Sequence, residues 1–123
     1  MAEIVTIPAY TFFRGTDHEF PVTVLNAAQT AAIDITTFAL SFVMRRTKSG
    51  PILLTKTTPT GISIGGTYNA DPDVNTQVAT VIIADTDTDD LAVGNYYYEV
   101  KRTDAGFESV IVQGTVPLER SLH

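Results

Sequence analysis

Hydrophobic and polar residues alternate with a period of two along several stretches of this chain. Between residues 38 and 46 every second residue is apolar and shares one face of an extended segment, namely Phe38, Leu40, Phe42 and Met44. Segments 19–25 and 110–118 alternate in the same way, and segment 77–84 is apolar on both faces. A period of two predicts strands with one buried face, and segment 77–84 is predicted to be a strand covered on both sides.

Turn residues separate these segments. Ser49-Gly50-Pro51 predicts a hairpin between strands at 38–46 and 52–57. Asp104-Ala105-Gly106 predicts a three-residue hairpin loop with its glycine in the left-handed conformation. Segment 68–75 is predicted to be a loop, and Gly114 to mark a bulge or a close backbone contact in the last strand.

Composition supports an all-β fold. Val, Ile and Thr make up 12 + 10 + 19 = 41 of the 123 residues, and these β-branched side chains favour strands. About seven to eight short strands predict an immunoglobulin-like antiparallel β-sandwich. The segment Leu91-Ala92-Val93-Gly94-Asn95-Tyr96 resembles the entrance to a tyrosine corner, although the chain has no cysteine or tryptophan.

The length predicts one domain, which we divide into an N-terminal apolar strand or arm (1–15), a β-sandwich (16–119) and a short tail (120–123). Either the first segment packs as the first strand, or it docks on another subunit. In the second case its apolar side chains are candidate partner-binding residues, namely Ile4, Val5, Ile7, Tyr10, Phe12 and Phe13.

The charge distribution changes the picture further. Eight basic and 14 acidic residues give a net charge of −6, which argues against nucleic-acid binding. No apolar run is long enough to span a membrane, and the N-terminus lacks the features of a signal peptide. Between Lys56 and Lys101 there are seven acidic residues and no basic one. This stretch is either a solvated acidic loop end or a patch that faces a basic partner or a cation, with Asp71 and Asp73 as candidate contacts.

Candidate chemistry is sparse. Asp85-Thr86-Asp87-Thr88-Asp89-Asp90 begins like a calcium-binding loop, but the glycine and the bidentate glutamate that such a loop needs are replaced by Asp90 and Tyr96. We interpret it as a turn with a single capped helical turn. His18 and His123 lack metal-ligand spacing, and no serine lies in a nucleophile-elbow motif. We therefore expect no enzyme, no cofactor and no metal site.

Three consecutive tyrosines form a further candidate. Alternation places Tyr96 and Tyr98 on one face and Tyr97 with Glu99 on the other. We expect Tyr96 and Tyr98 to pack in the core, and we retain Tyr97 as a candidate partner or ligand contact.

Taken in order, these motifs resemble a known family. Phe13-Arg14-Gly15-Thr16-Asp17, the segment 33–36 before the strand at 38–46, the run Leu91 to Val100 and the closing segment 114–119 together resemble short immunoglobulin-like virion proteins of tailed bacteriophages. The resemblance covers residues 3–119, and a similar pattern occurs in the N-terminal domains of phage baseplate upper proteins.

The resemblance implies a non-enzymatic structural protein of the virion, assembled in the host cytoplasm. No fibre or trimeric stalk follows the sandwich, which favours a capsid decoration or cement protein that binds neighbouring major capsid subunits, with possible self-association. The alternative is a tail or baseplate adaptor, or a glycan-adhering module.

Overall fold

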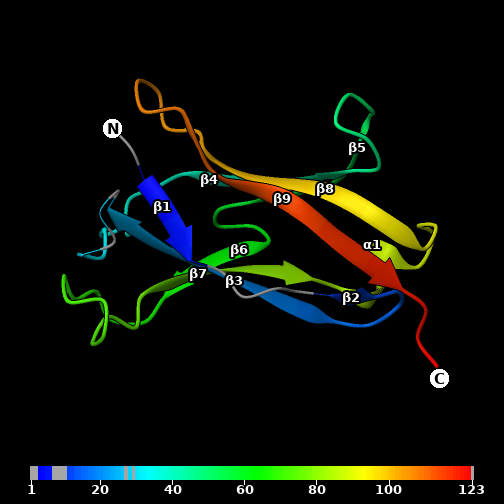
Figure 1. Cartoon of the computed structure of the whole chain (residues 1–123), viewed down its shortest axis with the longest axis horizontal. Helices are drawn as coiled ribbons and strands as arrows, with labels where there is room; N and C mark the ends of the chain where they lie inside the picture. The colour runs from blue at the N-terminus through cyan, green and yellow to red at the C-terminus, as the bar shows by residue number, and fades with distance from the viewer. Residues whose placement is uncertain (1–2, 7–10, 27, 29, 123) are drawn as a thin grey trace.

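The computed structural model describes residues 3–6, 11–26, 28 and 30–122, with the backbone alone described for residues 3–6. Its described residues form two β-sheets and one short helix (Figure 1). The strands are β1 (Glu3–Thr6), β2 (Phe12–Phe13), β3 (His18–Asn26), β4 (Leu40–Arg45), β5 (Ile52–Thr57), β6 (Ile62–Gly65), β7 (Val78–Ile83), β8 (Gly94–Arg102) and β9 (Ser109–Glu119); the helix is α1 (Asp85–Thr88).

The two sheets have the strand orders β1-β3-β7-β6 and β2-β9-β8-β4-β5. All described pairs are antiparallel except the short parallel pair of β2 with β9. Adjacent strands connect within a sheet through the β4–β5, β6–β7 and β8–β9 hairpins, and the other connections cross between sheets (Figure 1). This order is that of an immunoglobulin-like sandwich, so the predicted fold class is confirmed. The described residues form nine strands, because the N-terminal segment gives one short strand to each sheet.

The predicted turns are found where the sequence placed them. Residues 46–51 join β4 to β5, and residues 66–77 join β6 to β7. Gly106 has φ 84°, as expected for a left-handed glycine, but the β8–β9 loop spans residues 103–108 and is longer than the predicted three residues. The bulge in β9 lies at Ile111 rather than at Gly114. Gly114 instead lies in close contact with Tyr98, because a Cβ at this position would be 3.1 Å from the Tyr98 hydroxyl.

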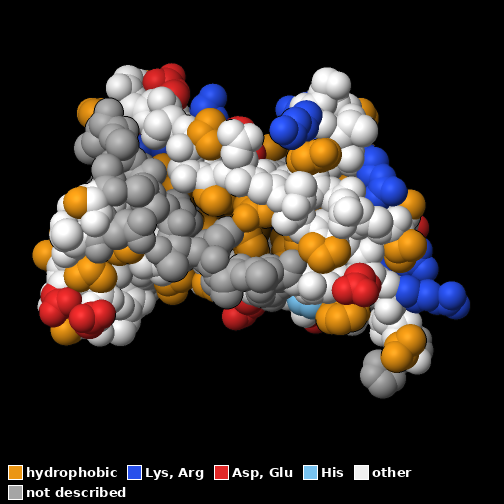
Figure 2. Space-filling view, viewed as in Figure 1, with side chains coloured by type: hydrophobic (Ala, Val, Ile, Leu, Met, Phe, Trp, Pro, Cys, Tyr) orange, Lys and Arg blue, Asp and Glu red, His pale blue; other side chains and the backbone are white. Residues whose placement is uncertain are grey.

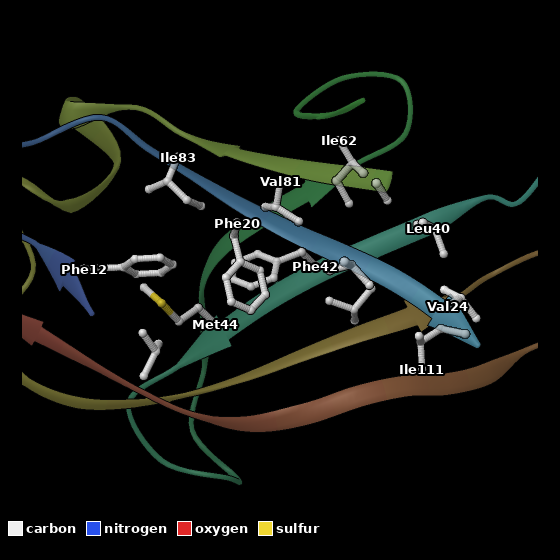
Figure 3. Packing of buried hydrophobic residues seen from close by; sticks show 14 of the residues in the cluster. Phe12, Phe20, Val24, Leu40, Phe42, Met44, Ile62, Val81, Ile83 and Ile111 are labelled. Carbon is white, nitrogen blue, oxygen red and sulfur yellow. The ribbon is translucent and has the colours of Figure 1, made fainter. Parts of the chain in front are cut away.

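Alternation along the strands places one apolar face of each sheet in the core. Phe20 from β3, Phe42 from β4 and Tyr98 from β8 meet there, with ring centroids 5.1 to 6.2 Å apart. Figure 3 shows Phe20 and Phe42 at the centre of the cluster and Phe12 at one end beside Met44. In antibody domains a disulfide and a tryptophan connect these same three strands. Here an aromatic cluster fills that place, in a chain without cysteine.

One predicted burial pattern is wrong. Segment 77–84 was expected to be covered on both faces, but Ile82 on β7 is 45% exposed. Its neighbours Val81 and Ile83 are fully buried. The four-stranded sheet has no described element over its outer face, so Ile82 points to solvent.

The tyrosine corner is present. The Tyr96 hydroxyl donates a hydrogen bond to the carbonyl of Ala92 at 2.5 Å, and Tyr96 is 2% exposed. The Arg46 guanidinium lies 5.0 Å from the Tyr96 ring centroid and occupies the space beside Gly94. The turn that precedes β8 is therefore fixed by both the Tyr96 hydroxyl and the Arg46 guanidinium.

Candidate functional site

The outer face of the five-stranded sheet is hollowed. In Figure 2 the upper outline of the molecule dips between the β8–β9 hairpin and the β4–β5 hairpin. The hollow has a volume of about 570 Å³. We call it the sheet hollow, and its lining residues are Val43, Arg45, Lys48, Tyr97, Tyr98, Glu99, Gln113, Gly114 and Thr115.

Strand register arranges the floor of the sheet hollow in two rows across β4, β8 and β9. The rows are Val43–Glu99–Gln113 and Arg45–Tyr97–Thr115. Residues paired across antiparallel strands share a face, so all six side chains belong to the outer face. Tyr97 thus lies between the Arg45 cation and the Thr115 hydroxyl, on the face of the sheet opposite the core. The predicted split of the tyrosines between two faces is confirmed.

The β4–β5 hairpin forms a basic wall of the sheet hollow. Arg45 Nη1 donates to the Gly50 carbonyl at 2.7 Å, which fixes the hairpin loop against its own strand. The Lys48 ammonium lies 5.5 Å from the Tyr97 ring centroid. Such a cation–π contact at an exposed site is worth about 0.5–1 kcal/mol, so Lys48 rests on the ring and is readily displaced.

Tyr98 borders the sheet hollow at Gly114, but its ring packs against Phe20 and Phe42 on the core side of the same strand. Burial raises the pKa of the Tyr98 hydroxyl above its ordinary value of 10.0. The side chain therefore stays neutral and serves packing, as the sequence predicted.

The acidic residues do not form one patch, which corrects the interpretation of a single acidic loop end. Asp71 and Asp73 lie in the loop that precedes β7, whereas four aspartates lie in the segment that follows it. The two groups are therefore at opposite ends of the sandwich (Figure 1). The second group is Asp85, Asp87, Asp89 and Asp90.

The loop that carries Asp71 and Asp73 is tightly built. Asp71 Oδ1 accepts the Asp73 N–H at 3.0 Å, and the Asp71 carbonyl accepts the N–H groups of Val74 and Asn75. Asp73 is exposed and Val74 is 56% exposed. The tip therefore presents one carboxylate and one apolar side chain on an ordered turn.

Three loops meet at this end, namely residues 30–39, 66–77 and 103–108, and we call it the loop end. Gln77, 6% exposed, lies at its centre. Its Oε1 accepts the Ile35 N–H at 3.0 Å, and its Nε2 donates to Asp34 Oδ1 at 3.1 Å and to Thr36 Oγ1 at 2.8 Å. Sequence reasoning missed this residue, because a glutamine at the start of an apolar run gives no signal of burial.

Two carboxylates of the loop end act as acceptors for backbone N–H groups. Hydrogen bonds from Thr36 and Gln77 lower the pKa of Asp34. The N–H of Ala39 donates to Asp104 at 2.6 Å, and this bond, followed by Arg102, lowers the pKa of Asp104.

The segment that begins like a calcium loop forms α1, as interpreted from the sequence. Asp87 accepts the Ala84 N–H at 2.7 Å and pairs with Lys56 at 2.8 Å, while Asp17 accepts the Asp85 N–H at 2.7 Å. In the part of the chain that the structure describes, no group of three or more His, Asp or Glu side chains is placed to hold a metal.

The N-terminal candidates divide into three groups. Ile4 and Val5 lie in β1, paired with Leu25 and Val24. Ile7 and Tyr10 lie outside the described residues. Phe13 is 43% exposed and stacks on the ring of His18.

The prediction that Phe12 contacts a partner is corrected. The residue is 1% exposed and belongs to the core, so the folded domain offers none of its side chain to a partner.

His18 is the first residue of β3. Its Nε2 accepts the Phe13 N–H at 2.9 Å, and its ring lies against Phe12. The residue therefore helps to hold β2 in place.

No protein-family model and no curated protein matches the chain. The helix that the structure describes is too short to cross a membrane. The site is therefore interpreted from its own geometry.

Proposed function

We propose that this protein is a non-enzymatic structural protein of a tailed-bacteriophage virion, and that it decorates the capsid by binding neighbouring major capsid subunits. The virion assignment rests on the resemblance of the ordered sequence motifs. The observation that supports a binding role is the sheet hollow, an open depression on the five-stranded sheet with Tyr97 on its floor. Aromatic and arginine side chains on such a preformed surface are typical of protein contacts.

Two surfaces are assigned to the partner in this proposal. The first is the sheet hollow with Tyr97, and the second is the exposed tip of the loop end with Asp71 and Asp73. Phe13 and the strand β1 are a further contact beside the β2–β9 edge.

The copy number of the protein in purified particles tests this proposal. Quantitative mass spectrometry of virions that encode the chain is expected to find many copies, and labelling with an antibody is expected to cover the whole shell. A few copies at one vertex or on the tail support the adaptor alternative instead. Absence from particles overturns the virion proposal.

Tyr97→Ser tests the assigned surface. Because Tyr97 is on the outer face, the variant is expected to fold normally and to bind particles more weakly by about tenfold or more. Thr55→Ser, on the exposed edge strand outside the sheet hollow, is the matched control. Equal binding of both variants removes the sheet hollow from the contact.

A further inference from the structure

The sheet hollow is concave and its wall is basic. The basic lining residues Arg45 and Lys48 lie beside Tyr97, whereas the acidic lining residue Glu99 lies in the neighbouring row of the floor. The floor adds Val43 and the ring of Tyr97. An occupant that fits this surface is convex, carries a negative charge and places an apolar group against the ring.

The tip of the loop end has these three properties. It projects from the sandwich as the connection between β6 and β7 (Figure 1). Asp73 is exposed, and its carboxylate is not among the acceptors that build the turn, while the neighbouring Val74 is 56% exposed. The turn is ordered before binding, so little conformational entropy is lost when it docks.

One molecule cannot bring these two surfaces together. Strand β4 runs from the loop end toward its basic hairpin, because Leu40 pairs with Arg102 and Arg45 pairs with Tyr97. The loop tip precedes β7 at the loop end, and the basic hairpin lies beyond the other end of β4. The surfaces therefore face different directions, and any contact between them joins two molecules.

We infer that the protein associates head to tail, with the tip Asp71–Val74 of one copy in the sheet hollow of the next. In this contact Asp73 meets Lys48 and Arg45, and Val74 takes the place of the Lys48 side chain on Tyr97. Because the two surfaces differ, a copy that uses one of them in a contact keeps the other free for a further copy, and the contact forms rings or open chains. This inference concerns the purified protein and does not depend on the virion proposal.

Light scattering coupled to gel filtration tests the association over a range of protein concentrations. At about 10 mM salt, where charges act over about 30 Å, the mass is expected to rise with concentration beyond that of one chain. At about 0.15 M salt the association is expected to weaken, since the screening length falls to about 8 Å. One chain at every concentration and both salt levels overturns the inference.

Charge exchange identifies the contact. Lys48→Glu and Asp73→Lys are each expected to weaken association by about tenfold, because each places like charges together. The double variant restores opposite charges between copies and is expected to recover most of the association.

Lys101→Glu and Asp90→Lys are the matched controls. Both residues are exposed, lie outside the two surfaces, and change the net charge as the test variants do. Circular dichroism of each variant checks that it folds. Failure of the double variant to recover, or equal weakening by the controls, assigns the association to net charge or to another surface and overturns the proposed contact.

Discussion

The two ends of the sandwich are ordered by partly different interactions, with a buried amide at one end and a buried phenol at the other. At the loop end, side-chain amide and carboxylate groups bind backbone N–H groups, with Gln77 buried among them. At the other end, which we call the corner end (residues 14–17, 46–51 and 84–93), the carboxylates of Asp17 and Asp87 also accept backbone N–H groups. In addition, a phenol and cations bind carbonyl groups and rings there. Asp34 and Asp104 are therefore not simply solvated, because each accepts a backbone N–H group.

The difference has a consequence for how each end tolerates change. The loop end is constrained by its backbone, since its acceptors point at particular N–H groups. At the corner end, part of the constraint comes from the long side chains of Arg45 and Arg46, which have other rotamers. We therefore expect substitutions at the loop end to cost more stability than comparable ones at the corner end.

A pair of glycine variants gives the largest expected effect. Gly66→Ala at the loop end forces a Cβ against the Thr76 carbonyl at φ 82°. Strain and clash are expected to lower the free energy of unfolding by about 3 kcal/mol or more. Gly94→Ala at the corner end meets the tip of Arg46, which can move, and is expected to cost about half as much. Urea unfolding of both variants measures the difference, and equal losses contradict the comparison.

Gln77→Leu tests the buried amide of the loop end. The variant leaves the Ile35 N–H without its acceptor, and an unsatisfied buried donor costs about 1–3 kcal/mol. We expect a loss of about 2 kcal/mol in urea unfolding. Thr37→Ala, an exposed substitution in the same end, is the control and is expected to change stability little. A stable Gln77→Leu variant means that packing rather than hydrogen bonding orders this end.

The sequence predicted what depends on periodic burial and on local turns. Strand alternation placed Phe42, Tyr96 and Tyr98 in the core and Tyr97 outside it, and the corner was visible from the spacing of Leu91, Gly94 and Tyr96. These features follow from the period of two and from contacts a few residues apart.

What the sequence left open depends on contacts between distant segments. Gln77 and Ile35 are 42 residues apart, and nothing in either segment marks them as partners. The seven acidic residues between Lys56 and Lys101 share one stretch of the sequence, yet they lie in three places. Asp71 and Asp73 precede β7, four aspartates follow it, and Glu99 lies on the floor of the sheet hollow. Phe12 was grouped with surface residues because a short apolar segment gives no sign of which side chains turn inward.

Tyr96→Phe tests how much the hydrogen bond of the tyrosine corner stabilises the corner end, for comparison with Gln77→Leu at the loop end. It removes only the hydroxyl that binds the Ala92 carbonyl, and a typical intramolecular hydrogen bond contributes about 1 kcal/mol. We therefore expect a loss of about 1 kcal/mol in urea unfolding, smaller than that of Gln77→Leu. Tyr97→Phe changes the neighbouring outward phenol and is expected to be neutral. A loss larger than that of Gln77→Leu contradicts the ranking of the two ends.

Acid is expected to open the loop end alone. Of the predicted effects, this one changes the stability of the whole molecule least. The pKa values of Asp34 and Asp104 are lowered in the fold, mainly by hydrogen bonds from Thr36 and from the Ala39 N–H respectively. Their contribution to stability is therefore complete above the ordinary carboxyl pKa of 3.8 and is lost as the pH falls through the lower values of the folded state.

Amide exchange should increase first at Thr36 and Ala39, while amides of β3 and β8 stay protected. Asp104→Asn keeps an acceptor for the Ala39 N–H without a titrating group, so exchange at Ala39 should lose its pH dependence beyond the intrinsic rate. Uniform opening of both ends in acid would show that these carboxylates stabilise the whole sandwich rather than one of its ends.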